Sequence, residues 1–332
     1  MTLVNASFRT SLATPDEVSS ETDWTLALAS RNGGDGVQLH DYVVRRFGRK
    51  IPKQYCCMLG RRSMIEHTLD RLAEITPASR TLCVTASHHA EWAMPQLAGR
   101  ADHVFRQPAA RDTGIALYVA LSMIRRWAPN ATVTITPTDH YVAPATRYLE
   151  HVAAAQGVAR RMRDKVVILA VPALTPAPDL GYLLLGNAVT EIPEVRQVTN
   201  FVEKPCTPIA EDLLAQDALW NTMVMCGTVD ALWELGRVAD PHLLDILDSL
   251  VPLIGTPDED DALEYIYRAY LPVSFSRDIL ERAPERLCAL ELRDVEWSNW
   301  GNPERIEAVL ALRRSHALMP CADTRISGWH HT

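Results

Sequence analysis

The chain has 332 residues, of which 47% are hydrophobic, and its formal net charge is −8 at pH 7. This length and apolar content allow one large core or two modest ones. The mild negative charge predicts neither general nucleic-acid binding nor attraction to a membrane surface. No apolar run approaches the roughly 20 residues that span a bilayer. The seven cysteines are scattered without zinc-like spacing, so we expect reduced thiols in a cytoplasmic protein.

Short apolar, β-branched runs recur along the first half of the chain. They predict strands at 24–29, 80–86, 131–137, 165–171 and 181–186. These runs are continuously apolar rather than alternating, so both faces of the sheet should be covered. This favours an α/β fold, with a mostly parallel sheet flanked by helices.

Helical patterns lie between these strands, at 63–75, 114–128 and 144–162. Ser63 followed by Glu66 has the spacing of a capping box, which supports the start of the first helix. The second half is less regular. Strands are predicted there at 195–205, 220–227 and 286–294, and helices at 208–217, between Asp230 and about Tyr270, and from Pro303.

The chain shows neither an internal repeat nor a low-complexity linker. Residues 1–22 lack the basic start and apolar stretch of a signal peptide, and we interpret them as a flexible leader. We predict one large domain over 23–315, followed by a C-terminal tail over 316–332. Two separate domains are the alternative.

A glycine-rich tetrapeptide, GGDG at 33–36, follows the first predicted strand. Glycines let the backbone approach a phosphate closely and turn its N–H groups inward. Taken alone, the same tetrapeptide is more typical of an ordinary turn between a strand and a helix.

Two charged residues stand out in the first half. Lys53 follows a proline in a segment that should be extended, where it could carry charge to a phosphate or lie on the surface. Asp139 comes just past the strand 131–136, at the edge where ligands bind in open α/β sheets. A carboxylate there suits Mg²⁺ beside phosphate oxygens. Capping of the next helix is the alternative role.

Other polar side chains also follow predicted strands, namely Gln107, Asp112, Thr113, Glu203, Lys204 and Asn221. The glutamine could read a base edge, whereas the aspartate and threonine could equally cap a helix. The glutamate and asparagine suit sugar hydroxyls, and the lysine suits a sugar phosphate. Glu203, Lys204 and Asn221 could each also lie at the surface without a binding role.

In this order, the motifs resemble the sugar-1-phosphate nucleotidyltransferases, and among them mannose-1-phosphate guanylyltransferase (GDP-mannose pyrophosphorylase). The resemblance runs from about Trp24 to Arg305. It rests on the segments GGDGVQL, PKQYCCMLGRRSMIEHTLDR, QPAARDTG, TPTDHYV, GYLLLG, FVEKP, LWNTMVM, FSRDILERAPERL and EWSNWGNPERI. It implies a Rossmann-like mixed sheet of the nucleotide-diphospho-sugar transferase type.

The resemblance also implies a Mg²⁺-dependent reaction, in which a hexose-1-phosphate, here mannose-1-phosphate, displaces pyrophosphate from a nucleoside triphosphate, here GTP. Such a displacement depends on in-line positioning and charge stabilisation. Nucleotide binding is implied for Gly33, Gly34, Asp35, Gly36, Gln38, Gln107, Arg111, Asp112 and Thr113. The sugar-phosphate side is implied for Gly181, Glu203, Lys204 and Asn221. Lys53 and Asp139 would be catalytic, and Asp139 and Asn299 would be the metal ligands.

Two departures from the family pattern affect these roles. Gln38 stands where the family has an arginine that clamps the triphosphate, a loss that could cost on the order of 10²–10³ in rate. Asn299 stands where the family has a second metal aspartate, which should weaken metal binding. Arg31, in an apparent insertion, is a hypothetical substitute for the missing arginine.

These departures leave a second function open. The chain would then be a catalytically weak or inactive relative that binds nucleotide or nucleotide-sugar in a regulatory role. Under either function the predicted partners are a nucleoside triphosphate and a sugar-1-phosphate, and neither nucleic acid nor membrane. The sequence leaves a homo-oligomer open.

Overall fold

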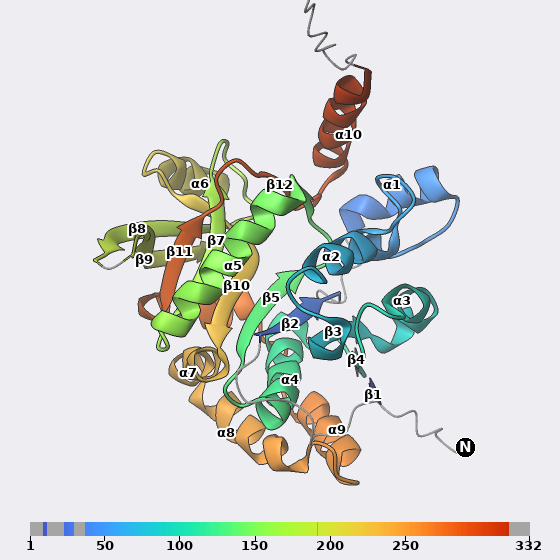
Figure 1. The fold of residues 1–332 in the computed structure, drawn as a ribbon, viewed down its shortest axis with the longest axis vertical. Helices are drawn as coiled ribbons and strands as arrows, with labels where there is room; N and C mark the ends of the chain where they lie inside the picture. Colours follow the sequence, from blue (N-terminus) through green and yellow to red (C-terminus); the bar gives the residue numbers. More distant parts are fainter. Residues whose placement is uncertain (1–8, 12–22, 30–36, 191, 319–332) are drawn as a thin grey trace, which may run out of the picture.

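The computed structural model describes residues 9–11, 23–29, 37–190 and 192–318, with the backbone alone at 9–11, 37–38 and 315–318. Within these ranges, ten strands form one sheet in the order β1-β4-β3-β2-β5-β10-β7-β11-β9-β8 (Figure 1). The strands are β1 (Arg9–Ser11), β2 (Asp23–Leu28), β3 (Thr81–Ala86), β4 (His103–Gln107), β5 (Thr132–Pro137), β7 (Val166–Pro172), β8 (Gly181–Val189), β9 (Ile192–Glu203), β10 (Leu219–Thr228) and β11 (Leu287–Glu291).

The sheet is mixed. Strands β4, β3, β2 and β5 run parallel to one another, as do β7 and β11. Strand β10 lies antiparallel between β5 and β7, and β8 and β9 pair antiparallel at one edge. A parallel pair needs a crossover connection, usually a helix, whereas strands that follow one another closely can pair antiparallel. The predicted α/β fold with a mixed sheet is therefore confirmed.

Helices cover both faces of the sheet (Figure 1). They are α1 (Val37–Phe47), α2 (Met64–Leu72), α3 (Ala90–Leu97), α4 (Asp112–Trp127), α5 (Ala145–Arg161), α6 (Thr207–Leu214), α7 (Val229–Ala239), α8 (Pro241–Leu250), α9 (Glu259–Ala269) and α10 (Pro303–Leu318). None of the helices in the described part of the chain is long and apolar enough to cross a bilayer.

Strand β7 shows why its sequence is continuously apolar. Ile168 packs in the core that contains α4, α7 and α8, whereas its neighbour Leu169 packs with α5 on the opposite face. Successive side chains of a strand point to opposite faces, so a strand covered on both sides needs apolar residues at every position. The prediction of a doubly covered sheet is confirmed.

The capping box at α2 is also confirmed. Ser63 Oγ accepts a hydrogen bond from the Glu66 N–H at 3.3 Å, and the Ser63 N–H donates to Glu66 Oε2 at 2.8 Å. By contrast, the two-stranded sheet of β6 (Tyr141–Ala143) and β12 (Glu296–Ser298) was not predicted. Strands of three residues are too short to carry a periodic signal.

The predicted flexible leader contains one described element. Residues Arg9–Ser11 form β1, which pairs antiparallel with β4 and extends the edge of the sheet. The rest of the segment 1–22 lies outside the described residues, so its flexibility stays a prediction. At the other end, α10 continues to Leu318, past the predicted domain boundary at 315.

Candidate active site

A cleft of about 600 Å³ opens at the carboxyl ends of the central strands. Leu28 and Ala29 border it at the end of β2, and Thr138 and Asp139 border it just past β5. Ligands bind at this edge in open α/β sheets. The predicted site residues that line the cleft are Lys53, Asp112, Thr113, Asp139, Glu203, Lys204 and Asn299.

The two predicted catalytic residues form an ion pair. Lys53 Nζ lies 2.7 Å from Asp139 Oδ2, and their side chains are 14% and 12% exposed. Lys53 Nζ also donates to the carbonyl oxygens of Asn299, at 3.0 Å, and Trp300, at 3.1 Å. An ammonium group has three donors, and these three acceptors engage all of them. Lys53 therefore joins β5 to the segment between β12 and α10.

Asn299 is held by an arginine that the sequence did not suggest for the site. Asn299 Oδ1 accepts a hydrogen bond from Arg305 Nη1 at 2.8 Å and another from the Gly301 N–H at 3.1 Å. The same guanidinium binds Asp179 in a bidentate pair, at 2.6 and 2.8 Å. Asp179 lines the cleft, so an arginine–carboxylate pair stands beside position 299. Bidentate pairs of this kind fix geometry strongly.

The sugar-side residues come together at the ends of β8 and β9. Gly181 pairs with Glu203 across these strands. A Cβ at residue 181 would lie 2.7 Å from Glu203 Oε2, so the glycine leaves space for this carboxylate. Lys204 Nζ lies 3.6 Å from Glu203 Oε1 and is about half exposed. The Glu203 carboxylate thus lies against Gly181, and the Lys204 ammonium group partly neutralises its charge.

A bulge in β10 directs Asn221 toward the same place. The pairing register with β7 shifts between Asn221 and Val224, and Met223 has a φ of +60°. Asn221 Oδ1 accepts from the Met223 N–H at 2.8 Å, which stabilises the bulge. Bulges often redirect a side chain at a functional site. Asn221, Gly181, Glu203 and Asn299 line one narrow extension of the cleft, of about 30 Å³.

The start of α4 forms another wall. Asp112 has a φ of +62°, which an aspartate tolerates better than most residues, and its Oδ1 accepts from the N–H and hydroxyl of Thr113 at 2.5 and 3.0 Å. Thr113 Oγ1 accepts from the Phe275 N–H at 3.1 Å. These bonds support local, helix-terminal roles for both residues, although both also face the cleft.

Gln107 and Arg111 are not among the residues that line the cleft. Both contact Tyr267 of α9. The Tyr267 hydroxyl donates to Gln107 Oε1 at 3.4 Å, and Arg111 Nε donates to the Tyr267 carbonyl at 2.8 Å. Burial raises the pKa of Tyr267, so its hydroxyl stays protonated. A nucleotide-binding role for Gln107 and Arg111 stays a prediction.

The glycine loop is outside the described residues. This applies to Gly33, Gly34, Asp35 and Gly36, and also to Arg31. Only the backbone of Gln38 is described, in the first turn of α1. The predicted roles of these residues therefore stay predictions.

Asp179, which lines the cleft, and Arg305, which binds Asp179, were not among the predicted site residues. Both lie inside or beside segments already singled out, because Asp179 precedes Gly181 by two positions and Arg305 falls near the end of the segment EWSNWGNPERI. Arg305 follows Asn299 by six positions, whereas Asp179 is 126 positions from Arg305 and meets it only in the folded chain. Spacing along the chain gave no signal for that contact.

The residues around the ion pair fit a divalent cation held by one carboxylate. Asp139 offers a carboxylate at the cleft, whereas Asn299 Oδ1 already accepts from Arg305 and from the backbone. Among the described residues, no three His, Cys, Asp or Glu side chains gather as a metal-binding group. Mg²⁺ commonly binds one or two carboxylates together with substrate phosphates. Asp139 provides one such carboxylate.

The mixed sheet with helices on both faces has the nucleotide-diphospho-sugar transferase fold. The model of the nucleotidyl transferase family matches residues 32–261, more than half of the chain. The chain therefore belongs to the nucleotidyl transferase family, which confirms the resemblance seen in the sequence.

Individual relatives are distant. A mannose-1-phosphate guanylyltransferase of Escherichia coli is 22% identical over 278 residues, which cover 81% of this chain and 58% of that protein. The alginate biosynthesis protein AlgA of Pseudomonas fluorescens is 26% identical over 219 residues, 64% of this chain and 44% of that protein. The chain thus spans about half the length of these curated relatives.

A similar solved structure is that of a mannose-1-phosphate geranyltransferase from Thermus thermophilus. It superposes with a TM-score of 0.73 at 24% identity, over 87% of this chain and 79% of that one. At this identity the likeness establishes the fold.

Proposed function

We propose that the chain is a Mg²⁺-dependent nucleotidyltransferase that joins GTP to mannose-1-phosphate and releases pyrophosphate. The observation that carries this proposal is the ion pair of Lys53 and Asp139, placed in one cleft with Glu203 and Lys204. The names of the distant relatives support the choice of mannose-1-phosphate and a guanine nucleotide. The cleft, at about 600 Å³, falls in the usual size range of small-molecule sites.

The roles of the side chains follow from their chemistry. An oxygen of the sugar phosphate would form a bond to the α-phosphorus while the bond from that phosphorus to the pyrophosphate oxygen breaks. Asp139 would hold Mg²⁺ beside the phosphate oxygens, and Lys53 fixes the position of this carboxylate. Bound Mg²⁺ supplies charge stabilisation at the phosphoryl oxygens. Glu203 and Asn221 would bind sugar hydroxyls.

A second candidate function is nucleotide or nucleotide-sugar binding without turnover. It is favoured by the contacts of two residues. Lys53 has all three donors engaged within the protein, and Asn299 supplies a neutral oxygen that Arg305 already binds. A chain with Gln38 and Asn299 in place of the arginine and aspartate of the family pattern would keep a binding cleft with a weaker reaction centre.

Pyrophosphate release separates these two functions. Purified protein would be assayed with hexose-1-phosphates against GTP, ATP, UTP, CTP and dTTP, with Mg²⁺ and with a chelator. We expect turnover with GTP and mannose-1-phosphate that is lost on chelation. Asp139→Asn should lower the rate at least about 10²-fold, whereas Asp261→Asn, an exposed change in α9, should not. Binding of GTP without release of pyrophosphate from any pair would establish the second function.

A further inference from the structure

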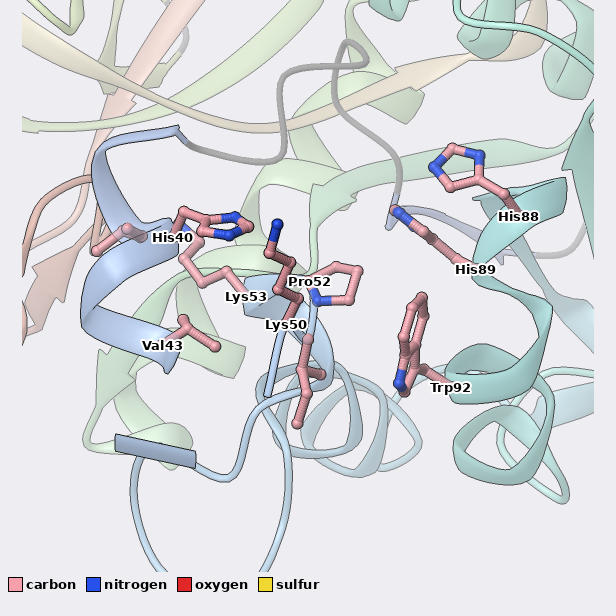
Figure 2. Close-up of a pocket in the computed structure, with 10 residues that line it drawn as sticks. His40, Val43, Lys50, Pro52, Lys53, His88, His89 and Trp92 are labelled. Atoms are coloured by element: carbon pink, nitrogen blue, oxygen red, sulfur yellow. The ribbon is translucent and has the colours of Figure 1, made fainter. Parts of the chain in front are cut away.

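A second hollow adjoins the cleft, and we call it the side pocket. It has a volume of about 140 Å³, and its polar lining consists of His40, Lys50, Lys53, His88 and His89. Figure 2 shows His40 on α1 at one side, the two histidines of η4 (Ser87–His89) at the other, and the lysines between them. Three separate segments of the chain therefore direct nitrogen-bearing side chains into one small space.

The charge of this lining has one sign. Among the described residues that line the side pocket there is no aspartate or glutamate. Lysine ammonium groups and imidazole N–H groups are hydrogen-bond donors, and a concavity lined by one sign of charge concentrates the opposite ion. The apolar side chains of Val43 and Trp92 complete the wall, and Lys50 and His88 are exposed to solvent. The ligand that fits is a small anion.

The side pocket and the cleft share part of their lining. Leu39, Pro52, Lys53 and His89 line both of them. The volume of the side pocket lies below the roughly 300 Å³ at which pockets for drug-sized ligands begin. It therefore suits one or two phosphate groups rather than a nucleoside.

Lys53 alone cannot neutralise the charge of several phosphate groups. Its charge is paired with Asp139 and its donors contact three acceptors of the protein. The terminal phosphates of a nucleoside triphosphate carry most of its negative charge and need cations of their own. Lys50 carries a full charge that no carboxylate of the described lining offsets, and His40 and His88 add donors on either side.

We propose that the side pocket binds a pyrophosphate group, as the β- and γ-phosphates of a nucleoside triphosphate in the cleft and as the free product after the reaction. Lys50 supplies charge, and His40 and His88 donate hydrogen bonds. The inference rests on the proposed function of the cleft. It assigns phosphate binding to three residues that no motif in the sequence had indicated.

Binding measurements by calorimetry test the proposal, with GTP, GMP and pyrophosphate as probes in the presence of Mg²⁺. We expect the double variant Lys50→Ala/His40→Ala to bind GTP and pyrophosphate at least about tenfold more weakly, which is a loss of about 1.4 kcal/mol. Its affinity for GMP should stay within about twofold. Arg49→Ala removes a neighbouring exposed charge that does not line the pocket, and it should leave all three affinities unchanged. Circular dichroism would establish that each variant folds.

Competition distinguishes the two sources of the pyrophosphate group. If it occupies the side pocket, pyrophosphate should compete with GTP but bind together with GMP. Equal losses for GTP and GMP, or an unchanged affinity for GTP in the double variant, would overturn the proposal. A wild-type protein that binds pyrophosphate through Lys50 but binds no nucleotide would overturn the proposed function and leave the pocket as a site for free pyrophosphate alone.

Discussion

Asn299 stands where the resembling enzymes have a metal-binding aspartate, and its nearest charged neighbour is Arg305, with 2.8 Å between Nη1 and Oδ1. Restoring the aspartate would place a carboxylate against this guanidinium, where it would form a charge-assisted hydrogen bond. We therefore expect Asn299→Asp alone to leave the affinity for Mn²⁺, a probe for Mg²⁺, within about twofold. The double variant Asn299→Asp/Arg305→Ala should raise it by about tenfold, or about 1.4 kcal/mol.

Electron paramagnetic resonance of free Mn²⁺ in the presence of GTP measures these affinities without relying on turnover. Arg305→Ala alone is the control, because it removes the guanidinium but adds no carboxylate. A tenfold gain in Mn²⁺ affinity from Asn299→Asp alone would show that Arg305 does not keep a carboxylate at position 299 from binding the metal.

Lys53 and Asp139 are both largely buried, at 14% and 12% side-chain exposure. Removing the ammonium leaves a carboxylate in a poorly solvated place. Breaking a fully buried pair costs about 3–5 kcal/mol, and partial exposure should reduce this to about 2 kcal/mol for Lys53→Met. Urea unfolding measures the loss.

Lys204→Met is a matched control. Lys204 is half exposed and its pair with Glu203 is long, at 3.6 Å, so this change should cost less than about 1 kcal/mol. A cost for Lys53→Met no larger than that of Lys204→Met would contradict the structural role of the buried pair.

At the scale of single elements, the start of α2 is the clearest case in which local sequence determines structure. Ser63 accepts from the Glu66 N–H, and its hydroxyl also donates to Gln96 Oε1 at 2.6 Å. Ser63→Ala removes both bonds, and we expect a loss of about 1–2 kcal/mol in the free energy of unfolding. Ser63→Thr keeps a hydroxyl and should retain most of the stability. The midpoints of urea unfolding compare the variants, and equal midpoints for alanine and threonine would refute a capping role.

Other elements could not have been predicted from their own residues. The bulge in β10 depends on its pairing with β7, because the register shifts between Asn221 and Val224 only relative to that neighbour. The strands β6 and β12 exist because Tyr141–Ala143 meets Glu296–Ser298. Neither segment is long enough to show a strand period, so tertiary contact decides their conformation.

For the whole molecule, buried thiols predict how stability depends on pH. Burial raises the pKa of Cys56, Cys83 and Cys226 to about 12 and that of Cys288 to about 11. In the unfolded chain, thiols lose their protons near pH 8.5. Between these values the unfolded state binds fewer protons than the folded state, so the free energy of unfolding falls as pH rises.

We therefore expect the urea midpoint to be steady at pH 7–8 and to fall between about pH 9 and 11. Each titrating thiol contributes up to about 1.4 kcal/mol per pH unit. The variant Cys83→Ala/Cys226→Ala should show a shallower fall than the wild type, although it starts from a lower stability. A midpoint that rises over this range would contradict the burial of these thiols.

The sequence by itself determined the α/β class and the positions of the main strands and helices. A continuous apolar run indicates a strand that is buried on both faces, and a helical period indicates a helix that is buried on one face. Both patterns can be seen within a short segment of sequence. The sequence also predicted that Asp139 and Glu203 belong to a site, because polar residues that follow strands gather at one edge of a sheet. The resemblance to the nucleotidyltransferases added Lys53.

Only the tertiary structure decided which of these residues touch. The pairing of Lys53 with Asp139 and the pairing of Arg305 with Asp179 join segments that are distant in the chain. The same is true of His88, which lies in one pocket with His40 and Lys50. Such contacts depend on how helices and loops pack around the sheet. The periodicity and spacing of residues indicate the helix or strand that a residue belongs to. They do not indicate which distant residue it contacts in the folded chain.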